Sequence, residues 1–247
     1  MIVNRTFPAN NRILINKKNF RNLIPKTPTT SKKKSIRKVI TDFIKTNDHP
    51  CLSAQSVVNN EALTIGEYNT LGSEASAAAL AKDLTLFIEN RISIKSRLVS
   101  FMAVFQMPEM LTEKQFEDLL WKQLELLHSV DTKQWDAAVS NDPEDRNFSF
   151  SFGGKAFYII GMHPKSSRMA RQFPYPALVF NLHQQFEELR GDGHYDKMRD
   201  IIRERDRKLQ GSVNAMVADH GTSSEAKQYS GRKVDESWKC PFHNKKQ

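Results

Sequence analysis

The chain has 247 residues, 39% of them hydrophobic, so it is long enough to bury one sizeable core. Its net charge is +9, but residues 1–41 contain eleven Lys or Arg and no acid, which leaves 26 basic and 28 acidic residues elsewhere. A slightly acidic body argues against nucleic-acid binding by a folded basic face. No run of about 18 apolar residues occurs, which argues against a membrane-spanning helix.

The basic segment at residues 1–34 also contains many Asn, Pro, Ser and Thr residues. This composition predicts a disordered leader, followed by a single domain at residues 35–247. An organelle transit segment and a nucleic-acid-binding arm are the other interpretations. The two cysteines, Cys51 and Cys240, are too few for a disulfide framework, so we expect a reducing, cytoplasmic environment.

Apolar periodicity gives the expected elements in chain order. Helices are expected at about residues 35–46, 74–92, 113–130, 183–190 and 195–209. Thr112 and Gln115 have the spacing of a capping box at the start of the third helix. Strands are expected at 98–105, 148–152, 156–161 and 177–182, with a hairpin turn at Gly153-Gly154. Without a repeat or strict strand–helix alternation, the pattern predicts an α+β fold, an antiparallel sheet covered by helices.

Two histidines follow predicted strands. His163 stands where the second hairpin strand ends at Pro164, and His183 stands where the next strand gives way to a helix. We expect the two strand ends to face a shared cleft, which would hold a ligand on rigid supports. Imidazole ligates iron, so both residues are candidate metal ligands. The alternative is that each ring only bonds a backbone carbonyl.

Two further residues extend this candidate site. Glu187 lies four residues after His183, on the same helix face, where it can orient the imidazole. Two histidines and a carboxylate also form the facial triad of non-heme iron oxygenases, although no His-x-x-x-His or Glu-x-x-His spacing is present. Cys240 is a candidate thiolate ligand or, alternatively, an inert thiol packed beside Trp238 and Phe242.

Charged residues complete the list of candidates. Arg168, Arg171 and Arg232 are candidate anion binders, because a guanidinium fork matches a carboxylate. A cationic substrate would need a carboxylate, for which Glu187 and Glu225 are candidates. The chain has no Gly-x-Gly-x-x-Gly fingerprint, so electrons for redox chemistry have to come from an external donor.

Several short motifs between residues 35 and 242 are informative as a set. They include His49-Pro50-Cys51, Phe148-Ser149-Phe150-Ser151, Gly161-Met162-His163-Pro164, Phe180-Asn181-Leu182-His183-Gln184-Gln185-Phe186, Tyr229-Ser230-Gly231-Arg232 and Trp238-Lys239-Cys240-Pro241-Phe242. In combination they resemble the YqcI/YcgG family. Some members of that family are similar to heme-dependent guanidine N-hydroxylases, such as those of guanitoxin and D-cycloserine biosynthesis.

The resemblance implies a heme b cofactor, O2, an external electron donor, and arginine or a related guanidino compound as substrate. No nucleic-acid or membrane partner is expected. We expect His163 as the axial ligand, with His183 and Cys240 as alternatives. The cofactor-binding candidates are His163, Arg168, Arg171 and Arg232, and the catalytic candidates are Glu187, Glu225 and His183. The alternative functions are a non-catalytic heme- or ligand-binding or sensing module and a non-heme iron oxygenase.

Overall fold

A computed structural model describes residues 34–46, 49–109, 112–214 and 224–244. Its α-helices are α1 (Ile36–Thr46), α2 (Leu52–Asn59), α3 (Glu74–Asn90), α4 (Glu113–Val130), α5 (His183–Gly191) and α6 (His194–Gln210). Its strands are β1 (Leu63–Thr70), β2 (Ser100–Met107), β3 (Phe150–Phe152), β4 (Lys155–Met162) and β5 (Ala177–Leu182). Short 3-10 helices occupy Arg91–Ser93, Met169–Arg171 and Glu225–Gln228.

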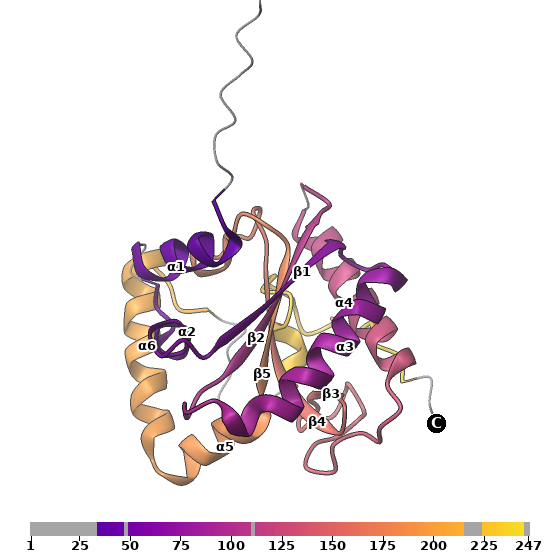
Figure 1. The fold of residues 1–247 in the computed structure, drawn as a ribbon. Coiled ribbons are helices and arrows are strands. Elements are labelled where there is room, and N and C mark those ends of the chain that lie inside the picture. The colour runs from indigo at the N-terminus through magenta and orange to yellow at the C-terminus, as the bar shows by residue number, and fades with distance from the viewer. Residues whose placement is uncertain (1–33, 47–48, 110–111, 215–223, 245–247) are drawn as a thin grey trace, which may run out of the picture. The chain divides into compact units, whose positions relative to one another are not determined.

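The strands form one mixed sheet in the order β1-β2-β5-β4-β3 (Figure 1). The pairs β2–β5, β5–β4 and β4–β3 are antiparallel, whereas β1 and β2 are parallel. The α+β class is confirmed, and the parallel pair is a departure from the expected antiparallel sheet. It arises from β1, an edge strand that the sequence did not predict because Gly66 and interspersed polar residues weaken its signal. The helix α3 supplies the crossover that a parallel pair requires.

Helices cover both faces of the sheet. In Figure 1, α3 and α4 lie on one side, and α1, α2 and α6 lie on the other. Successive strand residues alternate between these sides. In β2, Phe101 and Phe105 join the core that includes α3 and α4, while Met102 and Val104 join the core that includes α1. Adjacent residues of one strand therefore serve different cores.

Two local predictions are confirmed in detail. Thr112 caps α4, and the Gln115 side chain bonds back to the Thr112 backbone, which completes the capping box. Gly153 and Gly154 connect β3 to β4 with φ values of 63° and 73°, the left-handed pair that a tight hairpin turn requires. The turn chemistry thus fixes the start of β4, and with it the register of the residues that reach the cavity described below.

The predicted leader lies outside the described residues, apart from Lys34. The elements from Ile36 onward belong to one compact unit. Within the described part of the chain, no helix combines the length and the apolar character needed to cross a membrane.

Candidate functional site

A cavity of about 270 Å³ lies between the sheet and the helices α1, α2 and α6. Its walls are mostly apolar, with Phe43 from α1, Ile160 from β4 and Val179 from β5 among the lining residues. The neighbours Ile159 and Phe180 point instead into the core beneath α3 and α4. A partly open, mostly apolar space of this kind suits a ligand with an apolar body.

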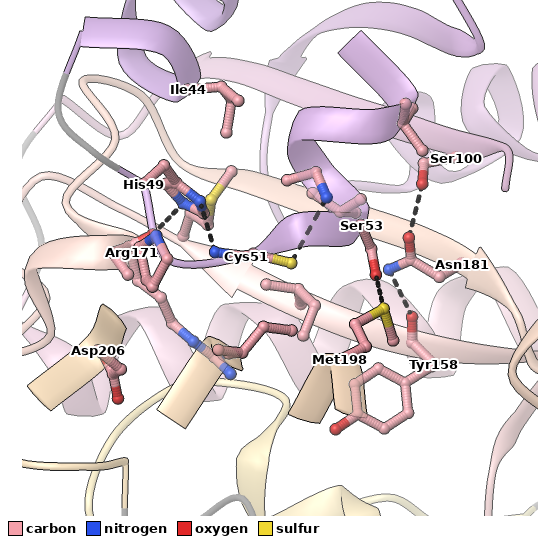
Figure 2. Close-up of a pocket in the computed structure, with 18 of the residues that line it drawn as sticks. Ile44, His49, Cys51, Ser53, Ser100, Tyr158, Arg171, Asn181, Met198 and Asp206 are labelled. Carbon is pink, nitrogen blue, oxygen red and sulfur yellow. Dashed lines mark hydrogen bonds between the residues drawn. The ribbon is translucent and has the colours of Figure 1, made fainter. Parts of the chain in front are cut away.

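A strip of polar groups crosses the sheet side of the cavity. The Ser100 hydroxyl donates to Asn181 Oδ1 at 2.6 Å, and Asn181 Nδ2 donates to the carbonyl oxygen of Tyr158 at 3.2 Å (Figure 2). These residues come from β2, β5 and β4, which are neighbours in the sheet. The two bonds fix the orientation of the Asn181 amide, so its oxygen has a defined position at the cavity wall.

The segment before α2 contributes an imidazole and a thiol to the cavity. His49 Nε2 lies 3.0 Å from the carbonyl oxygen of Ala170, and its Nδ1 accepts from the backbone N–H of Cys51 (Figure 2). Burial lowers the pKa of His49, so its ring is neutral, with the proton on Nε2 facing that carbonyl. Cys51 caps α2 through a bond from Ala54 N–H, and burial raises the pKa of its thiol. Both ring nitrogens of His49 are therefore engaged, and the thiol is neutral.

Positive charge predominates among the described residues that line the cavity. They include one carboxylate, Asp206, which binds Arg168 at 2.5 Å. Arg168 also donates to the Ser212 hydroxyl at 3.0 Å. The lining arginines are Arg168, Arg171, Arg190, Arg199 and Arg203. Such a wall favours a ligand that carries negative charge.

Arg171 is buried in this wall. Its Nη1 donates to the carbonyl oxygens of Gln228 at 2.8 Å and Tyr229 at 3.2 Å. Gly231 makes room for the side chain, because a Cβ at that position would lie 2.6 Å from Arg171 Cδ. Burial lowers the pKa of Arg171, yet a guanidinium keeps its charge across the accessible pH range. A permanent charge is thus held at a fixed place in the cavity.

His183 is the predicted ligand candidate that reaches the cavity. It begins α5, and its side chain is 14% exposed. Its Nε2 lies 3.5 Å from Oε1 of Glu187, which also pairs with Arg190. The spacing of four residues therefore brings the carboxylate to the imidazole as the sequence predicts. Glu187 itself does not appear among the described lining residues.

His163 lies on a different side of the sheet. Its ring is buried and stacks on Phe116 of α4, with ring centroids 4.3 Å apart. Its Nδ1 accepts from the backbone N–H of Lys165 at 3.3 Å. Burial lowers the pKa of His163 to about 4, so the ring is neutral. The described lining of the cavity does not include it.

The two predicted histidine ligands follow neighbouring strands that run in opposite directions. The C-terminal ends of these strands therefore lie at opposite ends of the sheet, measured along the strands. Because β4 and β5 are antiparallel, Met162 at the end of β4 pairs with Ala177 at the start of β5. Leu182 at the end of β5 pairs with Phe157, five residues earlier in β4. The strand ends are thus roughly 17 Å apart along the sheet. The expectation of one shared cleft is wrong, since only parallel neighbours bring their carboxyl ends together.

Glu225 and Arg232 take part in interactions away from the described cavity lining. The Glu225 carboxylate accepts from the hydroxyls of Ser149 at 2.7 Å and Tyr229 at 2.6 Å, and burial raises its pKa to about 7. Arg232 pairs with the buried carboxylate of Glu117 at 2.6 Å. Both residues tie the C-terminal segment to the sheet and to α4.

Cys240 packs against the core that includes α3 and α4. Burial raises the pKa of its thiol to about 12, so it is protonated. Across the described residues, no three His, Cys, Asp or Glu side chains come together as a metal-binding group. Of the possible donors in the described lining, His49 has both ring nitrogens engaged and Asp206 is paired with Arg168, which leaves His183 and Cys51 and no preassembled triad.

Several cavity residues were not predicted as site residues. Tyr158 was hidden inside an apolar strand, and only the alternation of β4 indicates that it faces away from the main core. Gln228 lies in a short 3-10 helix that the sequence pattern did not reveal. The motif containing His49 and Cys51 contributes to the family resemblance, but neither residue was predicted to line the site. Their proximity to β4 and β5 depends on how α2 packs on the sheet.

Fold and site together define an α+β protein with an apolar, arginine-lined cavity between sheet and helices. The sequence profile of the YqcI/YcgG family matches residues 40–243, and the chain belongs to this family. It is 27% identical over 204 residues to "Uncharacterized protein YcgG" of Bacillus subtilis (strain 168), covering 78% of this chain and 80% of the relative. It is 28% identical over 151 residues to "Uncharacterized protein YqcI" of the same organism, covering 59% of each. No solved structure matches.

Proposed function

We propose that this protein is a heme-dependent oxygenase that N-hydroxylates the guanidine group of arginine or of a related guanidino compound. The observation that carries the proposal is the chemical character of the cavity, whose apolar walls suit the face of a porphyrin and whose arginines suit its propionate groups. The similarity of some members of this family to guanidine N-hydroxylases supplies the reaction class. Fold alone does not determine chemistry, so the proposal depends on the cavity residues.

His183 is the residue that would hold the heme iron, because it lines the cavity and His163 and Cys240 are absent from the described lining. The carboxylate of Glu187 near its Nε2 can hold the ring in one orientation and increase its basicity. Cys51 is the second donor in the wall, and its neutral thiol would have to lose a proton before binding iron.

When bound, heme supplies the activation of O2. The apolar residues of the cavity would exclude water from the reacting atoms. In the overall reaction one oxygen atom enters a guanidine N–H bond, and the other leaves as water after receiving protons and electrons from an external donor. The guanidine end of the substrate would meet neutral acceptors such as Asn181 Oδ1, which can take a second hydrogen bond.

The test begins with cofactor loading. Purified protein reconstituted with hemin and then reduced is expected to show a Soret band that shifts on addition of CO. Incubation with arginine, 18O2 and a reductant is then expected to yield a product that has gained one labelled oxygen atom, detected by mass spectrometry. Failure to retain hemin through gel filtration contradicts the proposed cofactor.

A non-catalytic heme- or ligand-binding module is the second candidate. It is favoured by the position of Glu187 and Glu225, the predicted partners of a guanidinium, outside the described cavity lining. Asp206, the carboxylate that does line it, already binds Arg168. A stable heme complex that oxidises neither arginine nor its analogues would support this alternative.

A further inference from the structure

The charge of Arg171 lacks an acidic partner among the described residues. Arg168 pairs with Asp206, and Arg190 pairs with Glu187, but no described carboxylate forms an ion pair with Arg171. Its side chain is nevertheless deeply buried, since the residue is only 6% exposed. A buried charge is strongly destabilising unless it is paired. Asp206 interacts with this charge from beyond ion-pairing distance, so an anionic ligand in the cavity would supply a directly bonded partner.

The guanidinium has one edge available for that ligand. Its Nη1 bonds to the backbone carbonyls of Gln228 and Tyr229, which fixes the plane of the group. Nη1 also lies 3.4 Å from the carbonyl oxygen of Gly161, whereas Nε and Nη2 make no hydrogen bond to the described residues. These two nitrogens share one edge of the guanidinium, and their parallel N–H groups match the two oxygens of a carboxylate.

Two neutral polar groups stand beside Arg171 in the cavity wall. The side-chain oxygen of Gln228 is buried and has no hydrogen-bond partner in the described chain. Rotation of this amide presents either its oxygen or its NH2 group. Tyr158 of β4 also lines the cavity, as Arg171 and Gln228 do. Figure 2 shows Arg171 and Tyr158 on the side of the cavity away from Ile44.

We propose that Arg171, Gln228 and Tyr158 form a subsite for one carboxylate of an otherwise apolar ligand. A planar monoanion fits a single unpaired guanidinium flanked by neutral donors, whereas a phosphate dianion would call for further cations. The subsite is inferred from the burial, hydrogen bonds and cavity lining of these residues. Only the source of the carboxylate, a propionate of the cofactor or the acid group of the substrate, rests on the proposed function.

The subsite is tested by titrating the full-length protein with benzoate and with benzamide in a calorimeter. The wild type is expected to bind benzoate at least about tenfold more tightly, the range for a charge-assisted hydrogen-bonded pair. Arg171→Met removes the charge, and Gln228→Glu places a competing carboxylate beside it. Both variants are expected to bind the two probes within about twofold of each other. Gln228→Glu keeps the test valid if Arg171→Met does not fold.

Arg97→Gln is the matched control, since Arg97 pairs with the exposed Asp192 and does not line the cavity. Its preference for benzoate is expected to equal that of the wild type. No preference in the wild type, or an unchanged preference in both variants, overturns the subsite. Two comparisons identify which carboxylate binds at the subsite. Agmatine lacks the carboxylate of arginine, and the dimethyl ester of hemin lacks its free propionates. Benzoate selectivity without hemin binding would contradict the proposed function but support the carboxylate subsite.

Discussion

Buried ionisable residues occur in two settings in this molecule. Arg171 faces the cavity, where a ligand can complete its interactions. Glu225 is satisfied inside the protein, because the hydroxyls of Ser149 and Tyr229 both donate to its carboxylate. No described cation lies within ion-pairing distance of Glu225, so burial disfavours its charged form and raises the pKa to about 7. The first setting predicts ligand binding and the second predicts a pH-dependent stability.

Glu225 is expected to make the folded state less stable as pH rises. Its pKa is 4.5 ordinarily and about 7 when folded, so the unfolded chain releases the proton first. The stabilisation is complete below about pH 4.5 and is lost as the pH rises to about 7, a change of about 2–3 kcal/mol. Urea unfolding across this range is expected to show this dependence in the wild type and to lack it in Glu225→Gln. Identical pH profiles for the two proteins contradict the assignment.

His183 and His163 are expected to respond differently to substitution. On the proposed function, His183→Ala loses most of the bound heme, because its imidazole lies in the cavity wall. His163→Ala is expected to keep heme but to lower the free energy of unfolding by about 2–4 kcal/mol, because a buried stacked ring is removed. Heme content by absorbance and urea unfolding provide the two measurements. Heme loss only in His163→Ala would return the ligand assignment to that residue.

At the scale of elements, strand alternation and helix starts place the cavity groups. β4 directs Tyr158 and Ile160 to the cavity and Phe157 and Ile159 to the other core. β5 ends where α5 begins, which brings His183 to the cavity at the junction. The turn after the last 3-10 helix makes room for Arg171, since Gly231 with φ of 82° allows this side chain to pass close to the backbone.

Gly231→Ala is expected to damage both stability and carboxylate binding. The new Cβ would meet the Arg171 side chain at 2.6 Å, in addition to the cost of a positive φ. Gly211→Ala is the matched control, because Gly211 has φ of 77° and a Cβ added there would meet nothing within 4 Å. We expect Gly231→Ala to cost about 1 kcal/mol or more beyond the control. Equal unfolding free energies for the two variants would contradict a close fit around Arg171.

At the scale of the whole molecule, the sheet separates two cores of different character. The core with α3 and α4 is filled by large buried side chains, including Trp121 and Phe116. The opposite side is smaller and contains the cavity beside Phe43 and Met102. A filled core offsets the stability that is lost at a partly open, charged cavity. One face of the sheet thus provides stability and the other provides the binding site.

Removal of residues 1–34 tests whether the basic segment contributes to the stability of the folded domain. The segment lacks acidic residues and a strong apolar stripe, so its deletion is expected to leave the melting temperature nearly unchanged. Benzoate binding is expected to remain at the wild-type value as well. Differential scanning calorimetry and the same titration provide the measurements. A clear drop in either would show that the segment packs on the folded domain.

The sequence by itself determined most elements of this protein. The helix α4 and its Thr112 cap, the hairpin at Gly153-Gly154 and the strand β5 agree with prediction, because local spacing and turn chemistry specify them. The edge strand β1 was missed, since its partner β2 comes about 30 residues later and its own pattern is weak. Family membership was also visible from motifs distributed along the chain.

Only the tertiary structure decided which candidates share a cavity. Sequence order placed His163 and His183 after successive strands. Because those strands pair antiparallel, the two histidines lie at opposite ends of the sheet, measured along the strands. Arg171 and Gln228 are 57 residues apart, and their meeting depends on a turn that brings the C-terminal segment back to β4. Local patterns specify which face of an element a side chain occupies. They do not specify which distant element covers that face, because long-range packing makes this choice.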